Sequence, residues 1–165
     1  MGVSHKTIKN EFPSMKKRME ALNGEAVEVG ALNGEHAWLA SIHEYGCTMV
    51  VTQKQRRYMA TQGIILGKTL TIPERSFLRT GFDESRNDVM KKAQRMMADV
   101  VSGDMDANSC FEGVGIELSD RIKDFARDLS SPANHPFTID QKGSSNPLVG
   151  KTGEMIEGIT WRKAK

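Results

Sequence analysis

The stretch from Leu70 to Asp83 reads Leu-Thr-Ile-Pro-Glu-Arg-Ser-Phe-Leu-Arg-Thr-Gly-Phe-Asp and joins a strand-like segment to the longest helical pattern in the chain. Pro73 fixes its own φ angle and favours extended backbone at the preceding residue, so a strand is predicted to end at Ile72. After the proline, Leu78 and Phe82 are four residues apart and share one face if the segment is helical. The stretch therefore predicts a corner between a strand and a helix.

Two arginines have the same spacing within this corner. Arg75 and Arg79 are four residues apart, so a helical corner would carry a guanidinium side next to its apolar side. One interpretation is that this side binds a carboxylate of a neighbouring molecule. The other is that both arginines are solvated. The residues alone indicate an α+β domain able to assemble, and no reaction.

Length and composition fit one domain spanning residues 1–165. A chain of 165 residues can bury an adequate core, and a net charge of +2 provides no electrostatic argument for nucleic-acid binding. Its two cysteines, Cys47 and Cys110, predict a reducing compartment. The N-terminal sequence lacks a signal-peptide core and the myristoylation pattern, and no apolar run reaches the length of a membrane span. We expect a soluble protein that is cytoplasmic where it is made, with no membrane contact.

Hydrophobic periodicity predicts the elements before the corner. They are a helix over 14–22 capped by Ser14, a half-buried strand over 25–31, a helix over 36–45 with the apolar stripe Trp38, Leu39, Ile42 and Tyr45, and a strand over 47–52. Thr52 and Gln55 match a capping box and predict a helix from Gln53 toward Leu66. The apolar stripe of that helix is incomplete. Residues 53–71 are therefore interpreted as an insertion or arm, and residues 69–72 return as a strand beside 47–52.

Two long helices are predicted after the corner, over 84–102 and 106–129, and their short connection at Gly103 makes them antiparallel neighbours. Gly113 and Gly115 indicate a close approach by another backbone. The polar stretch 130–153, with one helical turn over 138–142, is interpreted as an interface loop. A last strand from Met155 to Lys163 would close the sheet. The predicted fold is α+β: a small mixed or antiparallel sheet against two long antiparallel helices, with a short N-terminal helix and extended loops or arms.

Three patterns suggestive of chemistry fail on spacing or context. Gly150-Lys151-Thr152 is similar to the end of a phosphate-binding loop, but its distance from Gly143 is too long and no long helix follows. A zinc site would have to use His36, His43, Glu44 and Cys47, which lack the paired ligands of known zinc motifs. His43 and Cys47 lack a third group to orient a nucleophile. We predict no catalytic residue, cofactor or metal, and no enzyme.

Three stretches together resemble the head–tail joining, or tail-completion, proteins of long-tailed bacteriophages. They are Leu39-Ala-Ser-Ile-His-Glu-Tyr-Gly46, Ile72-Pro-Glu-Arg-Ser-Phe-Leu-Arg79, and Lys142-Gly-Ser-Ser-Asn-Pro-Leu148 followed by Thr152-Gly153 and a terminal strand. Their order and spacing cover most of residues 25–163. The family usually has an aspartate before this Thr-Gly pair, where the present chain has Lys151, so a contact made by that carboxylate is not carried over.

The resemblance implies a non-enzymatic virion protein with a mixed sheet and helices on one side. Such proteins form a homo-oligomeric ring, here expected as a hexamer or a dodecamer, at the neck of the particle. The ring completes the tail, and its partners are the portal and adaptor of the head and the terminator or tube of the tail. Assembly would start in the host cytoplasm and end in the virion.

Other roles remain open. The chain could be a tail terminator that caps the tail tube, or a neck protein that touches genomic DNA through Lys54, Arg56, Arg57 and Lys68. An enzyme is the third class.

Within the ring, either the Glu74-Arg75 corner or the loop from Gly143 to Thr152 is expected to contact the adjacent subunit. Charge reversal at Arg75 or Arg79 is then expected to leave the fold intact and to block the joining of tails to heads. The predicted interface residues are Glu74, Arg75, Arg79, Lys142, Gly143, Ser144, Ser145, Lys151, Arg56 and Arg57.

Overall fold

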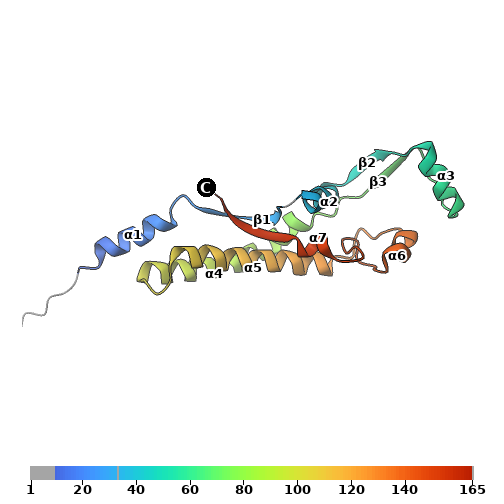
Figure 1. Cartoon of the computed structure of the whole chain (residues 1–165). Helices are drawn as coiled ribbons and strands as arrows, with labels where there is room; N and C mark the ends of the chain where they lie inside the picture. The colour runs from blue at the N-terminus through green and yellow to red at the C-terminus, as the bar shows by residue number, and fades with distance from the viewer. Residues whose placement is uncertain (1–9, 33, 165) are drawn as a thin grey trace, which may run out of the picture.

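The computed structural model describes residues 10–32 and 34–164, and the N-terminal sequence discussed for targeting lies outside them. Within these residues the helices are α1 (Phe12–Leu22), α2 (Gly34–Tyr45), α3 (Gln53–Thr61), α4 (Phe77–Ser102), α5 (Ala107–Asp128), α6 (Pro136–Lys142) and α7 (Glu154–Glu157). The strands are β1 (Ala26–Ala31), β2 (Cys47–Val50), β3 (Thr69–Ile72) and β4 (Ile159–Ala164). The molecule is elongated, with α1 at one end and α3 at the other (Figure 1). The predicted α+β class is confirmed.

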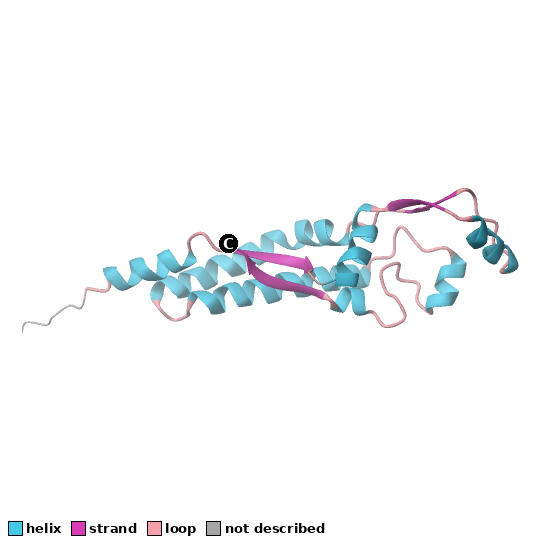
Figure 2. Ribbon diagram, turned by 45° about the horizontal axis from the view of Figure 1, so that its top comes forward, coloured by secondary structure: helices cyan, strands magenta, loops and turns pink. Residues whose placement is uncertain are grey.

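The two long helices α4 and α5 run antiparallel and form the body of the molecule, as predicted (Figure 2). Gly103 ends α4 in the left-handed region, with φ of 97°. Asp106 caps α5, because its carboxylate accepts a hydrogen bond from the amide of Ser109 at 3.0 Å. The buried core between the helices and the C-terminal segment consists of Ala40, Phe77, Val89, Leu118, Ile122, Ala126, Leu148, Met155, Ile156 and Ile159.

One two-stranded sheet lies along the helical body. Strands β1 and β4 pair antiparallel, with Ala26 opposite Ala164 and Ala31 opposite Ile159. Both strands pack against α5, where the ring of Trp161 fills the space over Gly115. The glycine pair of α5 therefore marks the approach of side chains, Trp161 and the end of Met96, and not of another backbone.

The second sheet forms an arm, which we define as residues 47–72. Strands β2 and β3 pair antiparallel, with Cys47 opposite Ile72 and Val50 opposite Thr69, and α3 is carried at their far end (Figure 1). The predicted pairing of these two strands is confirmed. The sheet expected as one unit is thus two separate antiparallel pairs.

Three predicted boundaries are wrong for local reasons. Helix α1 begins at Phe12, since Pro13 occupies its first turn, and the hydroxyl of Ser14 donates to the carbonyl of Glu11 instead of capping. Helix α3 begins at its predicted capping box but ends at Thr61, because Gly63 is left-handed. Strand β4 begins at Ile159, because residues 154–157 form the short helix α7.

Two further differences concern the start of helix α4 and the buried face of helix α2. Helix α4 begins at Phe77, seven residues earlier than predicted, and Phe82 on its surface is 42% exposed. Helix α2 faces inward through Ala40 and Glu44, because that side packs on α4 and α7. The predicted stripe is wrong at Trp38 and Tyr45, which are each 66% exposed, and at Leu39, which is 37% exposed.

Replacing Gly115 by alanine is expected to cost about 1–3 kcal/mol more stability than replacing Gly113 by alanine. Both changes lie in α5 and gain the same helix propensity, about 1 kcal/mol. At Gly115 the new Cβ would overlap the ring of Trp161, whereas at Gly113 it meets only the flexible end of Met96. Chemical denaturation of the two variants measures the difference, and equal stabilities would contradict this packing.

Candidate assembly site

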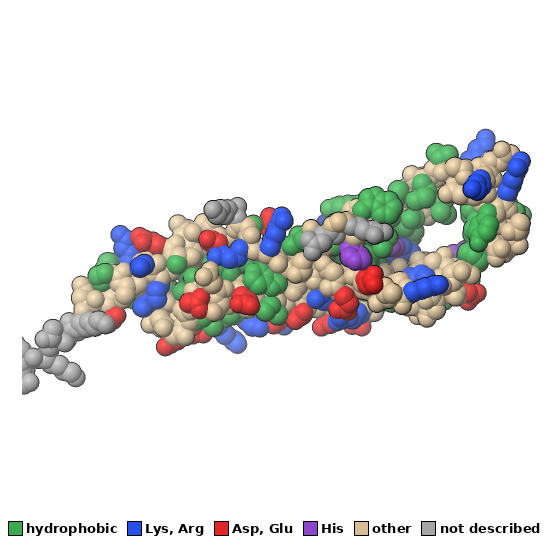
Figure 3. Space-filling view, viewed as in Figure 1, with side chains coloured by type: hydrophobic (Ala, Val, Ile, Leu, Met, Phe, Trp, Pro, Cys, Tyr) green, Lys and Arg blue, Asp and Glu red, His purple; other side chains and the backbone are tan. Residues whose placement is uncertain are grey.

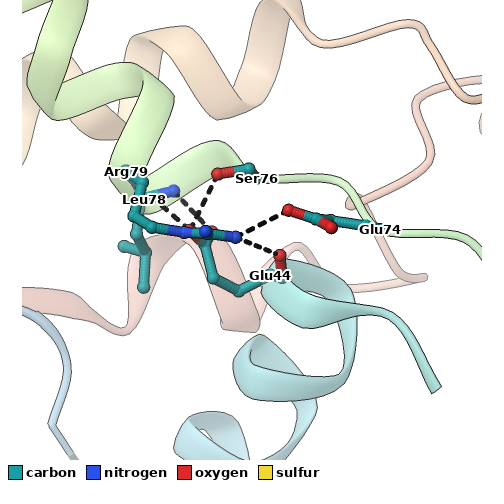
Figure 4. Close-up of polar contacts among 5 residues, drawn as sticks. All are labelled: Glu44, Glu74, Ser76, Leu78 and Arg79. Carbon is teal, nitrogen blue, oxygen red and sulfur yellow. Dashed lines mark hydrogen bonds and ion pairs between the residues drawn. The ribbon is translucent and has the colours of Figure 1, made fainter.

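A buried carboxylate starts the longest helix. Glu44, at the end of α2, is 2% exposed, and its side chain accepts hydrogen bonds from the amides of Leu78 at 2.8 Å and Arg79 at 3.1 Å (Figure 4). The hydroxyl of Ser76 also donates to Glu44, at 3.0 Å. Ser76 precedes α4 but makes no capping bond with its own side chain. Glu44 therefore satisfies amides at the first turn of α4, where a negative charge also stabilises the helix dipole.

Arg79 closes this arrangement from the solvent side. Its Nε donates to Glu44 Oε1 at 2.8 Å, and its Nη2 donates to Glu74 Oε1 at 2.7 Å (Figure 4). The guanidinium lies 4.9 Å from the ring centre of Tyr45. Burial raises the pKa of Glu44, but the hydrogen bonds from Arg79, Leu78 and Ser76 together outweigh burial and hold that pKa below its ordinary value. Glu44 is therefore ionised at neutral pH.

Arg75 holds a distant loop against the corner. Its side chain is only 4% exposed, and its guanidinium donates to the carbonyls of Pro132 at 2.7 Å and Ala133 at 3.4 Å, and to the side-chain oxygen of Asn134 at 3.0 Å. Its Nη1 lies 3.2 Å from His43 Nδ1. Arg75 therefore joins the corner to the start of the 130–153 loop.

His43 is neutral in this setting. Because arginine can only donate, Nδ1 of His43 accepts the bond from Arg75, and its proton is on Nε2. Burial, with the charges of Arg75 and Lys142, lowers the pKa of His43 from 6.5 to about 4. The unfolded chain therefore binds more protons than the folded one between pH 6.5 and 4, and His43 removes stability as the pH falls through that range.

Gly46 lets the backbone of the corner pass close to α2. It has φ of 70°, and a Cβ there would lie 2.9 Å from both the amide nitrogen of Glu74 and the carbonyl oxygen of Ile72. Only glycine fits this combination without strain. The close passage also allows the amide of Arg75 to donate to the carbonyl of His43 at 2.7 Å.

The three stretches that carry the family resemblance meet at this junction. Residues 39–46 end α2, residues 72–79 join β3 to α4, and residues 142–148 follow α6. The contacts of Glu44 and Arg75 join the first two stretches. Asn134, which receives a bond from Arg75, donates to the carbonyl of Pro147 in the third. These contacts lie within the subunit, at the base of the arm.

The arm itself is apolar on its surface. Its large exposed side chains include Val50, Tyr58 and Ile65, which are 80%, 64% and 94% exposed. They line a hollow of about 500 Å³ between the arm and α6, which Phe137 borders on the far side. Figure 3 shows hydrophobic side chains along the arm at this opening and basic side chains near its tip. Apolar side chains this exposed and this clustered are typical of an interaction surface, which makes the arm a candidate for one.

The arm also has a one-sided charge. Residues 47–72 contain Lys54, Arg56, Arg57 and Lys68, and no aspartate or glutamate. The rest of the chain contains 19 lysines and arginines and 21 aspartates and glutamates, so its net charge is −2. Among the described residues, Nε of Arg56 is buried without a hydrogen-bond partner.

The other predicted interface residues are spread over the junction and its loops. Glu74 and Arg79 are half-exposed and bind each other, while Ser145, Lys151 and Arg57 are exposed. Gly143 ends α6 in the left-handed region, with Ser144 half-buried after it. Lys142 is half-buried and donates to the carbonyls of Asn146 and Pro147. The predicted corner and loop are therefore neighbours in space.

One expectation needs correction. Arg75 was expected at the surface, where charge reversal would leave the fold intact, but its guanidinium is buried and binds three acceptors of the 132–134 segment. A carboxylate at this position would face carbonyl oxygens. Arg79 keeps a surface position, although its bonds to Glu44 and Glu74 lie within the chain.

Sequence reasoning missed two important residues. Glu44 had been considered only as a metal ligand, and no local signal identifies it as the cap of a helix 34 residues later. Asn146 fixes the loop to α5: its amide donates to the carbonyls of Ala126 and Arg127, and its oxygen accepts from the amides of Leu148 and Val149. The Asn-Pro pair was the available signal, since asparagine side chains commonly bond to nearby backbone in turns.

The described part of the chain shows no group of three or more His, Cys, Asp or Glu side chains placed to hold a metal ion. Across residues 10–32 and 34–164, no helix combines the length and the apolar character that crossing a bilayer needs. Comparison of the chain with protein-family models, curated proteins and solved structures finds no match.

Replacing Glu44 by glutamine is expected to cost about 1.5–3 kcal/mol of stability at pH 7, because charge-assisted hydrogen bonds to buried groups are lost. The folded-state pKa of Glu44 is lowered, so its contribution is complete above pH 4.5 and disappears as the pH falls through the folded-state value. Chemical denaturation of the wild type and the variant at several pH values measures the difference in their free energies of unfolding. His43 is present in both proteins, so its own pH-dependent contribution cancels from that difference.

Glu74→Gln is the matched control, because that carboxylate is 55% exposed and its ion pair with Arg79 lies at the surface. Its expected cost is about 0–1 kcal/mol. A Glu44 variant as stable as the Glu74 variant would refute the capping role.

Proposed function

We propose that this protein is a structural virion protein of a tailed bacteriophage, which forms a homo-oligomeric ring at the neck, completes the tail and joins it to the head connector. The main support for a ring is the arm, whose apolar side chains are exposed in the single subunit. The three resembling stretches support the neck as its place, and they build the junction from which the arm extends.

The occupant of the arm surface is, in this proposal, a second copy of the chain. The arm carries four positive charges and no negative one, and the remainder of the chain is net negative, so arm and body of neighbouring copies attract each other. A hollow in the body combines apolar and acidic residues: Phe125 and Leu129 line it together with Glu84 and Asp128. A contact between different surfaces of identical subunits is heterologous and closes into a ring when the rotation allows it.

A role in contacting DNA is the second candidate, and the acid-free arm is the observation that favours it. Binding of the purified protein to duplex DNA that weakens steeply with salt would support this role. A tail terminator, the third structural role, would be found on tails that have never met a head.

Purified wild-type protein is expected to form a closed oligomer, and Ile65→Asp is expected to abolish it. Ile65 is 94% exposed in the subunit, so a charge there leaves the fold unchanged but becomes costly when the arm is covered. Gln62→Asp adds the same charge to an exposed arm residue that does not line the apolar hollow and is the control. Sedimentation and native mass spectrometry give the oligomeric state, and circular dichroism confirms folding.

The outcomes separate two claims. A wild-type protein that stays monomeric at every concentration would refute the ring. A wild-type ring that Ile65→Asp leaves intact would refute the arm as its interface.

Deleting the gene from the phage genome is expected to give full heads and finished tails that remain separate in electron micrographs. Supplying the wild-type protein in the host should restore joined particles. Intact virions that lack the polypeptide would overturn the proposed location.

A further inference from the structure

A second feature of the junction, independent of the arm, is a group of basic side chains without a counter-charge. Arg75 is 4% exposed, and its guanidinium donates to two carbonyls, an amide oxygen and the neutral ring of His43. Among the described residues, no carboxylate forms an ion pair with it. A buried guanidinium surrounded only by neutral acceptors keeps its full charge.

Lys142 adds a second positive charge close by. Its Nζ donates to the carbonyls of Asn146 at 3.1 Å and Pro147 at 3.2 Å, which uses two of its three protons. Burial and the charge of Arg75 lower the pKa of Lys142, so the two groups are near enough to repel each other. In the described part of the chain, Lys142 likewise has no ion pair with an acidic residue.

Lys142 borders a hollow of about 300 Å³ between α2, α6 and the loop before α7, and Arg75 lies behind its wall. Lys142, His43 and Asn134 line it, and the latter two are hydrogen-bonded to Arg75. Thr152 adds a hydroxyl, and Leu39 adds an apolar wall. Glu154 also lines the hollow, but within the described residues it forms no ion pair with Lys142 or Arg75.

Two partly buried cations without a counter-ion are energetically unfavourable, because a buried charge is normally paired. The unused proton of Lys142, the hydroxyl of Thr152 and the amide of Asn134 are donors, which suit an acceptor-only group. We infer that this hollow binds one oxyanion, a carboxylate or a phosphate group. The inference does not rest on the proposed ring, because the hollow lies within one subunit. The oxyanion can be a free anion from solution or an acidic group of another molecule.

The test is thermal unfolding of the wild-type protein in sodium phosphate, sodium acetate and sodium chloride at equal ionic strength. Phosphate or acetate is expected to raise the midpoint above the value in chloride, in a manner that saturates with concentration. Lys142→Met is expected to weaken the apparent affinity for the anion at least tenfold. Lys151→Met removes an exposed lysine that does not line the hollow and should bind as the wild type does.

A second variant and a second measurement guard against a folding defect, because Lys142 also holds the loop. Thr152→Val changes an exposed residue and is expected to weaken binding several-fold. Amide chemical shifts of Gly150 and Thr152, followed by NMR during titration with inorganic phosphate, report binding at the hollow directly.

The salts distinguish the two sources of the anion. Stabilisation by phosphate alone assigns the site to phosphate, and stabilisation by acetate as well assigns it to a carboxylate. Equal midpoints in all three salts, or phosphate-induced shifts that are identical in the wild type, Lys142→Met and Thr152→Val, would overturn the inference.

Discussion

The structure depends on one carboxylate that α2 delivers to the beginning of α4. Without Glu44, the amides of Leu78 and Arg79 would lie in a half-buried first turn with no acceptor, since Ser76 does not cap the helix itself. The same carboxylate ties α2 to the helical body, because its four donor groups all come from residues 76–79. The arm begins and ends at this corner, since β2 follows α2 and β3 precedes α4.

The junction then holds the remaining parts through main-chain acceptors. Arg75 binds the carbonyls of the 132–134 segment, and Asn146 binds the last carbonyls of α5, so a long polar loop is anchored at two points. Gly46 permits the close passage that brings these groups together. A loop anchored in this way keeps a defined surface. A structural virion protein of the proposed kind would need such a surface, because its partners recognise shape.

Local signals predicted the elements, and long-range contacts decided their limits. The capping box at Thr52 and the stop at Gly103 involve neighbours in sequence, and both were read correctly. The start of α4 at Phe77 could not be read in this way, because its cap comes from 34 residues earlier. Similarly, Arg75 looks like a surface residue in sequence. Only the fold shows that the 132–134 segment covers it.

The family resemblance indicated where the candidate site lies, but not what its side chains do there. Residues 39–46, 72–79 and 142–148 do come together, but as a scaffold in which side chains satisfy one another. The exposed arm residues Val50 and Ile65 lie outside all three stretches, and periodicity gave only an incomplete stripe there. The residues of the three stretches bond mainly within the chain, so they carry little information about the exposed surface. The apolar surface of the arm became clear only from the structure.

The energetics of the arm favour a sequence of events in assembly. An isolated two-stranded hairpin is marginally stable in water, and in the arm the buried hydrophobic residue is Val51. The arm therefore buries little apolar area in the single subunit, and its exposed apolar side chains would add stability if another surface covered them. In a ring each subunit would give one arm and receive one, so a modest contact is repeated around a closed circle. Releasing a subunit from the closed ring would then require breaking two contacts. Weak single contacts would then let misplaced subunits leave before closure, and the closed ring would keep those that fit.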